Sequence, residues 1–118
     1  MGITFLNVKI YNSNNLKYSK DVQFLVDSGT NFSFVNSEVL KEMGVRPTHA
    51  KDFILANGGS IRRKMGHATF QYGENIGVAP VVFAEKDDEN LLGATALEAM
   101  CLILDPVKRK LLPLKLFA

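Results

Sequence analysis

Residues 24–35, with the sequence FLVDSGTNFSFV, constrain the fold more than any other part of the chain. An apolar run leads into Asp27, and a second apolar run follows the turn that begins there. Because an unpaired buried charge is costly, a buried strand rarely ends in an acid. Gly29 lets the backbone fold back closely, and Ser28 and Thr30 carry hydroxyls that can bond to backbone groups. Asp-Ser-Gly is also common in ordinary hairpin turns, so the tripeptide alone leaves a structural turn and an active site both open.

Length and composition favour a single domain, residues 1–118, with a core of its own. Apolar residues make up 47% and charged residues 22%, and no apolar run approaches the roughly 20 residues of a membrane span. A net charge of +2 is too small to indicate nucleic acid, and the two histidines and one cysteine lack metal-site spacing. Because Cys101 has no partner for an internal disulfide, we expect the reducing environment of the cytoplasm. The observations above predict no metal, nucleic-acid or membrane partner.

The first half of the chain is predicted to form strands around one short helix. The predicted strands are residues 3–11, 22–26 and 32–35, and residues 12–15 form the first turn. The apolar residues Ile3, Phe5, Val8 and Ile10 alternate with one slip, which a β-bulge would explain. Asn36 or Ser37 can cap a helix that runs through Met43, and Gly44 can close it.

The middle of the chain predicts a hairpin followed by further strands. Residues 51–56 and 61–65 flank the turn Asn57-Gly58-Gly59-Ser60. Gly66 is expected to interrupt the second strand before residues 67–72 continue, and residues 76–84 form the next strand. Pro80 suggests an edge position or a bulge within it. The charged run 85–90 is expected to be a solvated loop, and Arg62, Arg63 and Lys64 a solvated strand rather than a preference for acidic substrates.

A second diagnostic stretch, residues 91–100, has the sequence LLGATALEAM. Two apolar residues and a glycine lead into a helix, in which Thr95 and Glu98 have the spacing of a capping box. Residues 102–105 are then predicted as a strand, Pro106 and Val107 as a turn, and residues 111–116 as the last strand.

These motifs together resemble the retropepsin-like aspartic peptidases. The family pattern is apolar-apolar-Asp-Ser-Gly, then a glycine-bearing hairpin, then apolar-apolar-Gly and a helix, and the chain follows it in order over nearly its whole length. The ending LLGATALEAM with Ile-Leu-Asp-Pro resembles the small single-domain members of prokaryotes. The resemblance implies an all-β, closed barrel-like domain with a short C-terminal helix that works as a symmetric homodimer.

The resemblance also implies the chemistry. Asp27, Ser28 and Gly29 would be the catalytic residues, with one Asp27 from each subunit activating a water that attacks a peptide or protein substrate. No metal or organic cofactor is implied. The glycine-rich hairpin would be the flap that closes over the substrate. The implied substrate-binding residues are Thr30, Asn31, Ala56, Asn57, Gly58, Gly59, Leu91, Leu92 and Gly93.

Two departures and two alternatives remain at this point. Retroviral members carry a pairing Asp and Arg where this chain has Asn31 and Ala94, which puts their mode of dimer bracing in doubt but not the catalytic dyad. The apolar C-terminal run 111–117 fits a sheet between subunits and a strand packed on its own subunit equally well. The chain could also be a catalytically silent dimer that binds or scaffolds, or, if the resemblance is accidental, a small ligand-binding domain.

Overall fold

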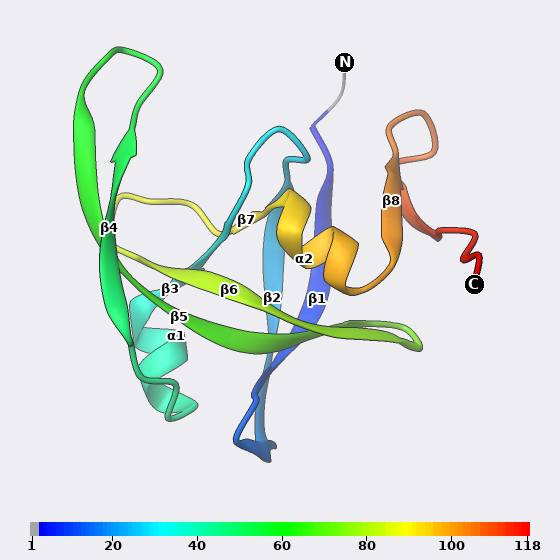
Figure 1. Ribbon diagram of the computed structural model, residues 1–118, viewed down its shortest axis with the longest axis horizontal. Coiled ribbons are helices and arrows are strands. Elements are labelled where there is room, and N and C mark those ends of the chain that lie inside the picture. The colour runs from blue at the N-terminus through cyan, green and yellow to red at the C-terminus, as the bar shows by residue number, and fades with distance from the viewer. Residues whose placement is uncertain (1–2) are drawn as a thin grey trace.

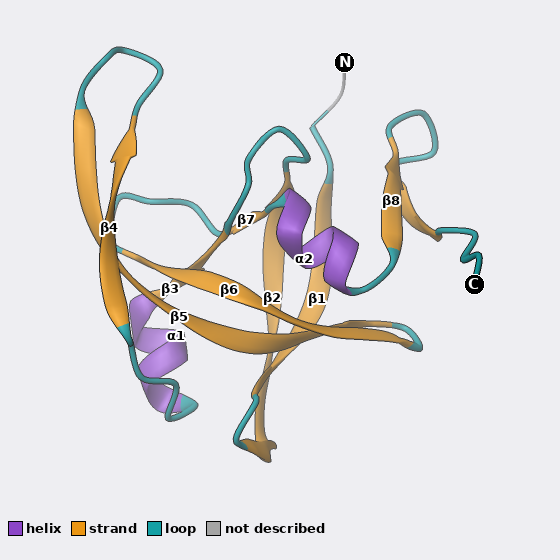
Figure 2. Cartoon of the chain, in the orientation of Figure 1, coloured by secondary structure: helices purple, strands orange, loops and turns teal. Residues whose placement is uncertain are grey.

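The computed structural model describes residues 3–118, so the first two residues of the predicted domain lie outside the described part. Strands dominate it, with two short helices (Figures 1 and 2). In chain order the elements are β1 (Phe5–Asn12), β2 (Asn15–Val26), β3 (Ser33–Asn36), α1 (Ser37–Glu42), β4 (His49–Ile54), β5 (Ser60–Tyr72), β6 (Asn75–Ala84), β7 (Leu91–Leu92), α2 (Ala94–Ala99), β8 (Leu102–Asp105) and β9 (Lys110–Pro113).

Seven strands form one sheet in the order β1-β2-β7-β3-β6-β5-β4. An additional pairing between β1 and β5 closes this sheet on itself, and β4 continues outside the ring as the partner of β5. β8 and β9 form a separate two-stranded sheet beside the barrel (Figure 1). The predicted all-β, closed barrel-like domain with a short helix towards the C-terminus is therefore confirmed.

The first strand differs from its prediction because its inward face begins with a polar residue. Thr4, Val8 and Ile10 are buried, whereas Ile3 and Phe5 are exposed. The alternation therefore has no slip, and the one register irregularity with β2 lies beside the turn. The bulge is therefore not where the apolar pattern suggested it, between Phe5 and Val8, because Thr4 holds the inward position there. The register irregularity that β1 does contain lies at Tyr11 and Asn12.

Gly66 does not interrupt β5, which runs without a break from Ser60 to Tyr72. A Cβ atom at Gly66 would lie 2.9 Å from the Arg46 carbonyl oxygen, so the glycine allows a close approach and not a turn. The expectation of an edge position for Pro80 is confirmed. β3 pairs with β6 only from Val81 onward, so at Pro80 the strand pairs with β5 alone and its other side is an edge.

The helix signals were correct at α1 and wrong at the start of α2. The Asn36 side chain accepts the N–H groups of Glu38 and Val39, and Gly44 has the positive φ of +76° that ends the helix. At α2 the N-cap is Gly93, which offers no capping side chain, so the predicted capping box is absent. Thr95 lies inside the helix and uses its hydroxyl elsewhere.

The core fills the barrel and continues under α2. Phe24 and Phe70 meet inside the barrel with ring centroids 6.1 Å apart, and Leu97 and Met100 extend the buried cluster to the helix. Leu111 of β9 belongs to the same cluster. The predicted strand 111–116 is thus in part a strand packed on its own subunit, and its assignment ends at Pro113.

Candidate active site

The two diagnostic stretches of the sequence lie side by side in the barrel. β7 runs parallel to the end of β2, with Leu25 opposite Leu91 and Val26 opposite Leu92. The Asp27 N–H donates a hydrogen bond of 3.0 Å to the Leu92 carbonyl. The acid therefore leaves the sheet at a fixed point, directly beside the apolar-apolar-Gly segment.

The Asp27 carboxylate is oriented by its own loop. Oδ1 accepts the Gly29 N–H and Oδ2 accepts the Thr30 hydroxyl, each at 3.0 Å. The Thr30 N–H closes the turn by donating to the Asp27 carbonyl at 3.1 Å. Asp27, Ser28 and Gly29 are all exposed in the single chain. The loop thus presents a pre-positioned acid at the surface and not in a closed pocket.

Gly93 packs tightly against the Asp27 loop. A Cβ atom there would lie 2.6 Å from the Phe32 carbonyl oxygen and 2.8 Å from that of Thr30. The Gly93 N–H donates at 2.9 Å to the hydroxyl of Ser33, which is fully buried. Only a residue without a side chain fits between the two arms of the loop, and the buried hydroxyl satisfies its backbone donor.

The first turn of α2 braces the loop from the other side. The Ala94 N–H donates to the Thr30 carbonyl at 2.7 Å. The N–H and hydroxyl of Thr95 both donate to the Asn31 carbonyl, at 3.0 and 2.8 Å. These contacts, all within the single chain, hold the loop near Asn31 and Ala94, the two positions where retroviral members carry a charged pair.

Sequence reasoning missed Ser33 and Thr95 as parts of the site. One feature of the sequence could have indicated Ser33: it is a small polar residue between two large apolar ones, Phe32 and Phe34, and its side chain points inward. Thr95 gave no such signal, because its partner lies 64 residues away in the sequence.

The predicted substrate-binding residues fall into three groups. Thr30, Asn31 and Leu91 lie beside the Asp27 loop, and Leu91 is half-buried. The exposed tip of the β4–β5 hairpin carries Ala56, Asn57, Gly58 and Gly59, and it projects from the same side of the barrel as the Asp27 loop (Figure 1). Leu92 and Gly93 are buried beneath the loop.

The base of the β4–β5 hairpin packs against the segment that follows the Asp27 loop. The Phe53 ring on β4 lies edge-on to Phe32, with centroids 6.3 Å apart, and is tilted against Phe34 at 5.7 Å. All three rings are half-buried. This aromatic cluster joins the hairpin to the candidate site through apolar contact.

The charged run 85–90 is not a freely solvated loop. Asp88 forms an ion pair with Arg63 of β5, and the Asn90 side chain and carbonyl accept N–H groups from Asn36 and Leu25. Hydrogen bonding from Arg63 lowers the pKa of Asp88, against a smaller opposing effect of burial. The same hydrogen bond raises the pKa of Arg63. The expectation of a solvated loop was therefore wrong for Asp88 and Asn90, and the expectation of a solvated strand was wrong for Arg63, whose side chain is only 15% exposed.

This lowered pKa predicts acid-sensitive stability. Because the folded pKa of Asp88 lies below its unfolded value of about 4, the unfolded chain binds more protons as the pH falls through this window. The stabilisation is therefore present at neutral pH and is lost below about pH 4. We expect Asp88→Asn to lower the free energy of unfolding at pH 7 by on the order of 1 kcal/mol and to flatten its fall below pH 4.

Urea titrations at several pH values, with Asp52→Asn as the control, measure this. Asp52 pairs with Arg62 at the surface, where both side chains are about two-thirds exposed. An acid dependence in Asp88→Asn as steep as in the wild type would contradict the assignment.

No group of three or more His, Cys, Asp or Glu side chains is placed to hold a metal ion within residues 3–118. No helix in that range is long and apolar enough to cross a membrane.

Comparison with known proteins gives one family and one fold. A family model described as aspartyl protease matches residues 7–96. The protease of simian foamy virus (mac) superposes with a TM-score of 0.52 at 16% identity, covering 79% of this chain and 92% of that one. The retroviral protease-like domain of Ddi1 from Leishmania major superposes with a TM-score of 0.56 at 16% identity, covering 95% and 90%. No curated protein matches the sequence. At this identity the structural matches establish the retropepsin-like fold.

Proposed function

The chain belongs to the aspartyl protease family, and on that premise we propose that it is an aspartic endopeptidase that works as a homodimer. The observation that carries this proposal is the geometry of Asp27. Its carboxylate stands at the surface, fixed by Gly29 and Thr30, in a loop braced on both sides by the rest of the domain. An ordinary hairpin corner can also hold an Asp in this way, but here Gly93 and the start of α2 brace the loop as well, and the acid has no cationic partner within the loop.

In the dimer, two copies of Asp27 would face each other across a two-fold axis. Two carboxylates about 3 Å apart share one proton, which is the established behaviour of aspartic protease dyads and is carried over to this chain. The ionised Asp27 takes a proton from a water held between the pair, and that water attacks the scissile carbonyl. The protonated Asp27 donates to the carbonyl oxygen. By the same family resemblance, Ser28 would bond across the dyad.

Three features of the chain support a second copy as the partner at this surface. Each chain carries a single Asp-Ser-Gly, so one chain holds half of a dyad. Ser28 borders an apolar hollow formed with α2, β8 and Leu114. Beyond β9, Leu116 and Phe117 are 73% and 90% exposed. A partner that covered these apolar side chains would remove them from water, which favours association.

The substrate would be a peptide bound between the loop and the flap, which is the tip of the β4–β5 hairpin. Thr30, Asn31 and Leu91 would contact it from below, and Ala56, Asn57, Gly58 and Gly59 from above. Leu92 has none of its side chain exposed, so we assign it and Gly93 the role of supporting the loop. The whole chain 1–118 would act as one domain, and the unpaired Cys101 suits a reducing compartment such as the cytoplasm.

The dimer predicts that activity depends on concentration. We expect Leu116→Asp combined with Phe117→Asp to give a folded monomer with peptide cleavage lowered at least about 10-fold at micromolar protein, because two charges would have to be buried at the interface. Sedimentation and cleavage of a diverse peptide library measure the two effects together. Wild-type activity per chain should also fall on dilution.

The matched control is Leu16→Asp, at a side chain on β2 that is 58% exposed. It should leave both properties unchanged. A double variant that still sediments as a dimer and cleaves at the wild-type rate would contradict this role of the C-terminal segment. A folded wild-type dimer that cleaves no peptide in the library would favour the scaffolding alternative.

A further inference from the structure

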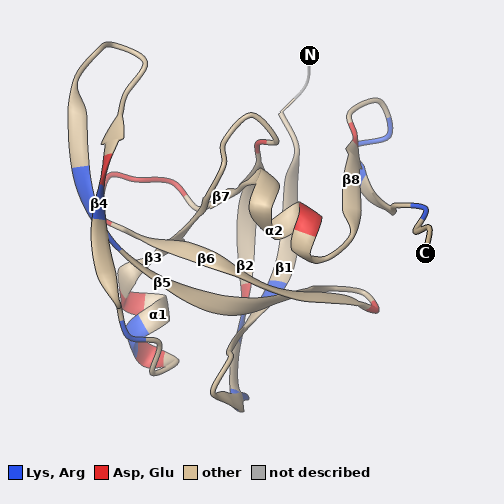
Figure 3. Cartoon of the chain, viewed as in Figure 1, with Lys and Arg blue, Asp and Glu red and all other residues tan. Residues whose placement is uncertain are grey.

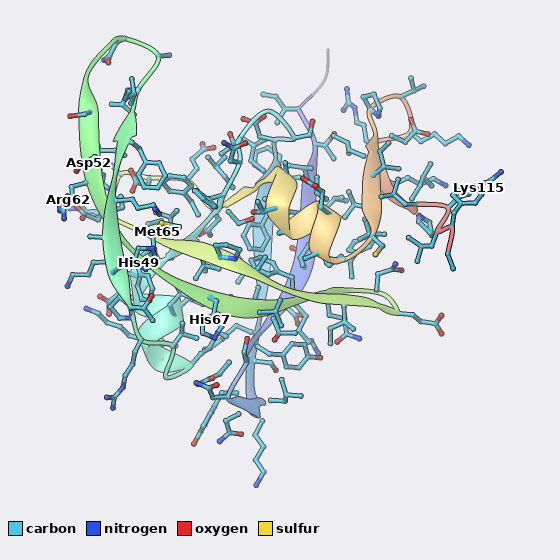
Figure 4. The ribbon with its side chains drawn as sticks, viewed as in Figure 1. His49, Asp52, Arg62, Met65, His67 and Lys115 are labelled. Carbon is cyan, nitrogen blue, oxygen red and sulfur yellow. The ribbon has the colours of Figure 1, made fainter. Side chains whose placement is uncertain are left out.

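Two consecutive arginines on β5 make different ion pairs. Arg62 pairs with Asp52 across the β4–β5 hairpin at 3.0 Å, and both side chains are about two-thirds exposed. Figure 4 shows this pair on the hairpin itself. Arg63 turns away from the hairpin and reaches Asp88 in the loop between β6 and β7, and only 15% and 18% of these side chains are exposed. Figure 3 shows this acidic loop passing beside the basic band of the hairpin.

The Arg63–Asp88 contact is a two-pronged one. Arg63 Nε donates to Asp88 Oδ2 at 2.8 Å and Nη2 donates to Oδ1 at 3.2 Å. Its Nη1 donates to the Arg62 carbonyl at 3.0 Å and lies 3.5 Å from a Glu85 carboxylate oxygen. Asp88 Oδ2 also accepts the Glu85 N–H at 2.9 Å. A guanidinium held at this many points fixes direction as well as distance, which a lysine could not do.

The loop that Arg63 binds leads directly into β7, the strand that pairs with the end of β2 just before Asp27. Two residues after Asp88, the Asn90 carbonyl accepts the Leu25 N–H at 2.9 Å. Its side-chain oxygen accepts the Asn36 N–H at 2.8 Å. The chain then enters β7, whose Leu92 carbonyl receives the Asp27 N–H. The base of the hairpin is therefore tied by short polar contacts to the segment that positions Asp27.

The other strand of the hairpin is anchored nearby. Phe53 on β4 packs on Phe32 and Phe34 and lies opposite Ile61 in the ladder, while Arg63 lies opposite Lys51. One strand is thus held by apolar contact and the other by charge, two rungs apart. Above these anchors the hairpin is open, with Ile54 86% exposed and residues 54–60 all exposed.

We propose that Arg63, through Asp88, is a positioning residue that clamps the base of the flap to the β6–β7 loop, so that closure over a peptide is confined to residues 54–60. This inference rests on the proposed function, since it assigns the hinge of that enzyme's flap. Without Arg63, β5 loses both of its ion pairs to the β6–β7 loop among the described residues, those with Asp88 and Glu85, and the hinge moves down the hairpin.

Arg63→Met tests the clamp, and Arg62→Met is the matched control on the neighbouring residue. We expect hydrogen exchange of the hairpin amides 51–53 and 61–65 to become about 10-fold faster in Arg63→Met and to stay unchanged in Arg62→Met. KM for a cleaved peptide should rise roughly 10-fold in Arg63→Met, with kcat changed less. Arg63→Lys should lie between the two, because it keeps the charge and loses the fork.

Equal exchange in Arg62→Met and Arg63→Met would overturn the clamp. If Arg63→Met does not fold, Asp88→Asn takes its place, because the amide removes the negative charge and one of the two hydrogen bonds from Arg63. Hydrogen exchange is measured without any catalysis, so it tests the Arg63 clamp separately from the proposed peptidase activity. Faster exchange in a protein that cleaves nothing would support the clamp and refute the protease, and unchanged exchange in an active protein would refute the clamp alone.

Discussion

Asp27→Asn is expected to abolish peptide cleavage, with a loss of about 10⁴-fold or more in kcat, while the fold and the dimer persist. The amide is nearly the same size as the carboxylate, and its oxygen can still accept the Gly29 N–H that now binds Oδ1. Its NH2 group would face the Thr30 hydroxyl, which can accept as well as donate. An amide cannot take a proton from water at any relevant pH. The variant therefore lacks the general base but keeps the conformation of the loop.

Cleavage of a diverse peptide library by the wild type and the variant, purified side by side, measures this. Asp52→Asn is the control, because it changes an exposed acid on β4, below the tip of the hairpin, and leaves Asp27 intact. Inhibition of the wild type by a transition-state mimic with a hydroxyl between the two carboxylates would support the same site. Equal cleavage by the Asp27→Asn and wild-type proteins would place the activity elsewhere.

Gly93→Ala is expected to lower the free energy of unfolding of the domain by about 3 kcal/mol. It should also remove most of the peptide-cleaving activity of the molecules that still fold. The added methyl would collide with the Phe32 and Thr30 carbonyl oxygens on both sides, and these are backbone atoms that cannot rotate away. The Asp27 loop must therefore shift, and with it the carboxylate that Thr30 helps to orient. Urea unfolding and the specific activity of the folded fraction measure the two effects.

Gly77→Ala separates these effects. A Cβ atom there would collide with the Ala99 carbonyl where β6 passes under α2, away from the Asp27 loop. It should therefore lower stability while the activity per folded molecule stays close to that of the wild type. A Gly93→Ala protein as stable and as active as the wild type would contradict the tight packing of Gly93 against the Asp27 loop.

The local chemistry of the sequence determined much of this protein. The alternation of strands, the glycine-bearing hairpin turn and the Asn36 and Gly44 helix signals can each be interpreted within a few residues, because turns and caps are made by neighbours in the chain. The Asp27 loop could also be found in this way, since an acid at the end of an apolar run is unusual in any context.

The tertiary structure alone decided how that loop is held. Ser33 beneath Gly93, Thr95 on the Asn31 carbonyl and Arg63 on Asp88 join residues 25 to 64 positions apart. Gly66 looked like a strand break and instead marks a close approach to Arg46, because the approaching backbone comes from another part of the chain. Such contacts depend on which strands the closed barrel brings together, and no spacing within one segment of the sequence encodes that.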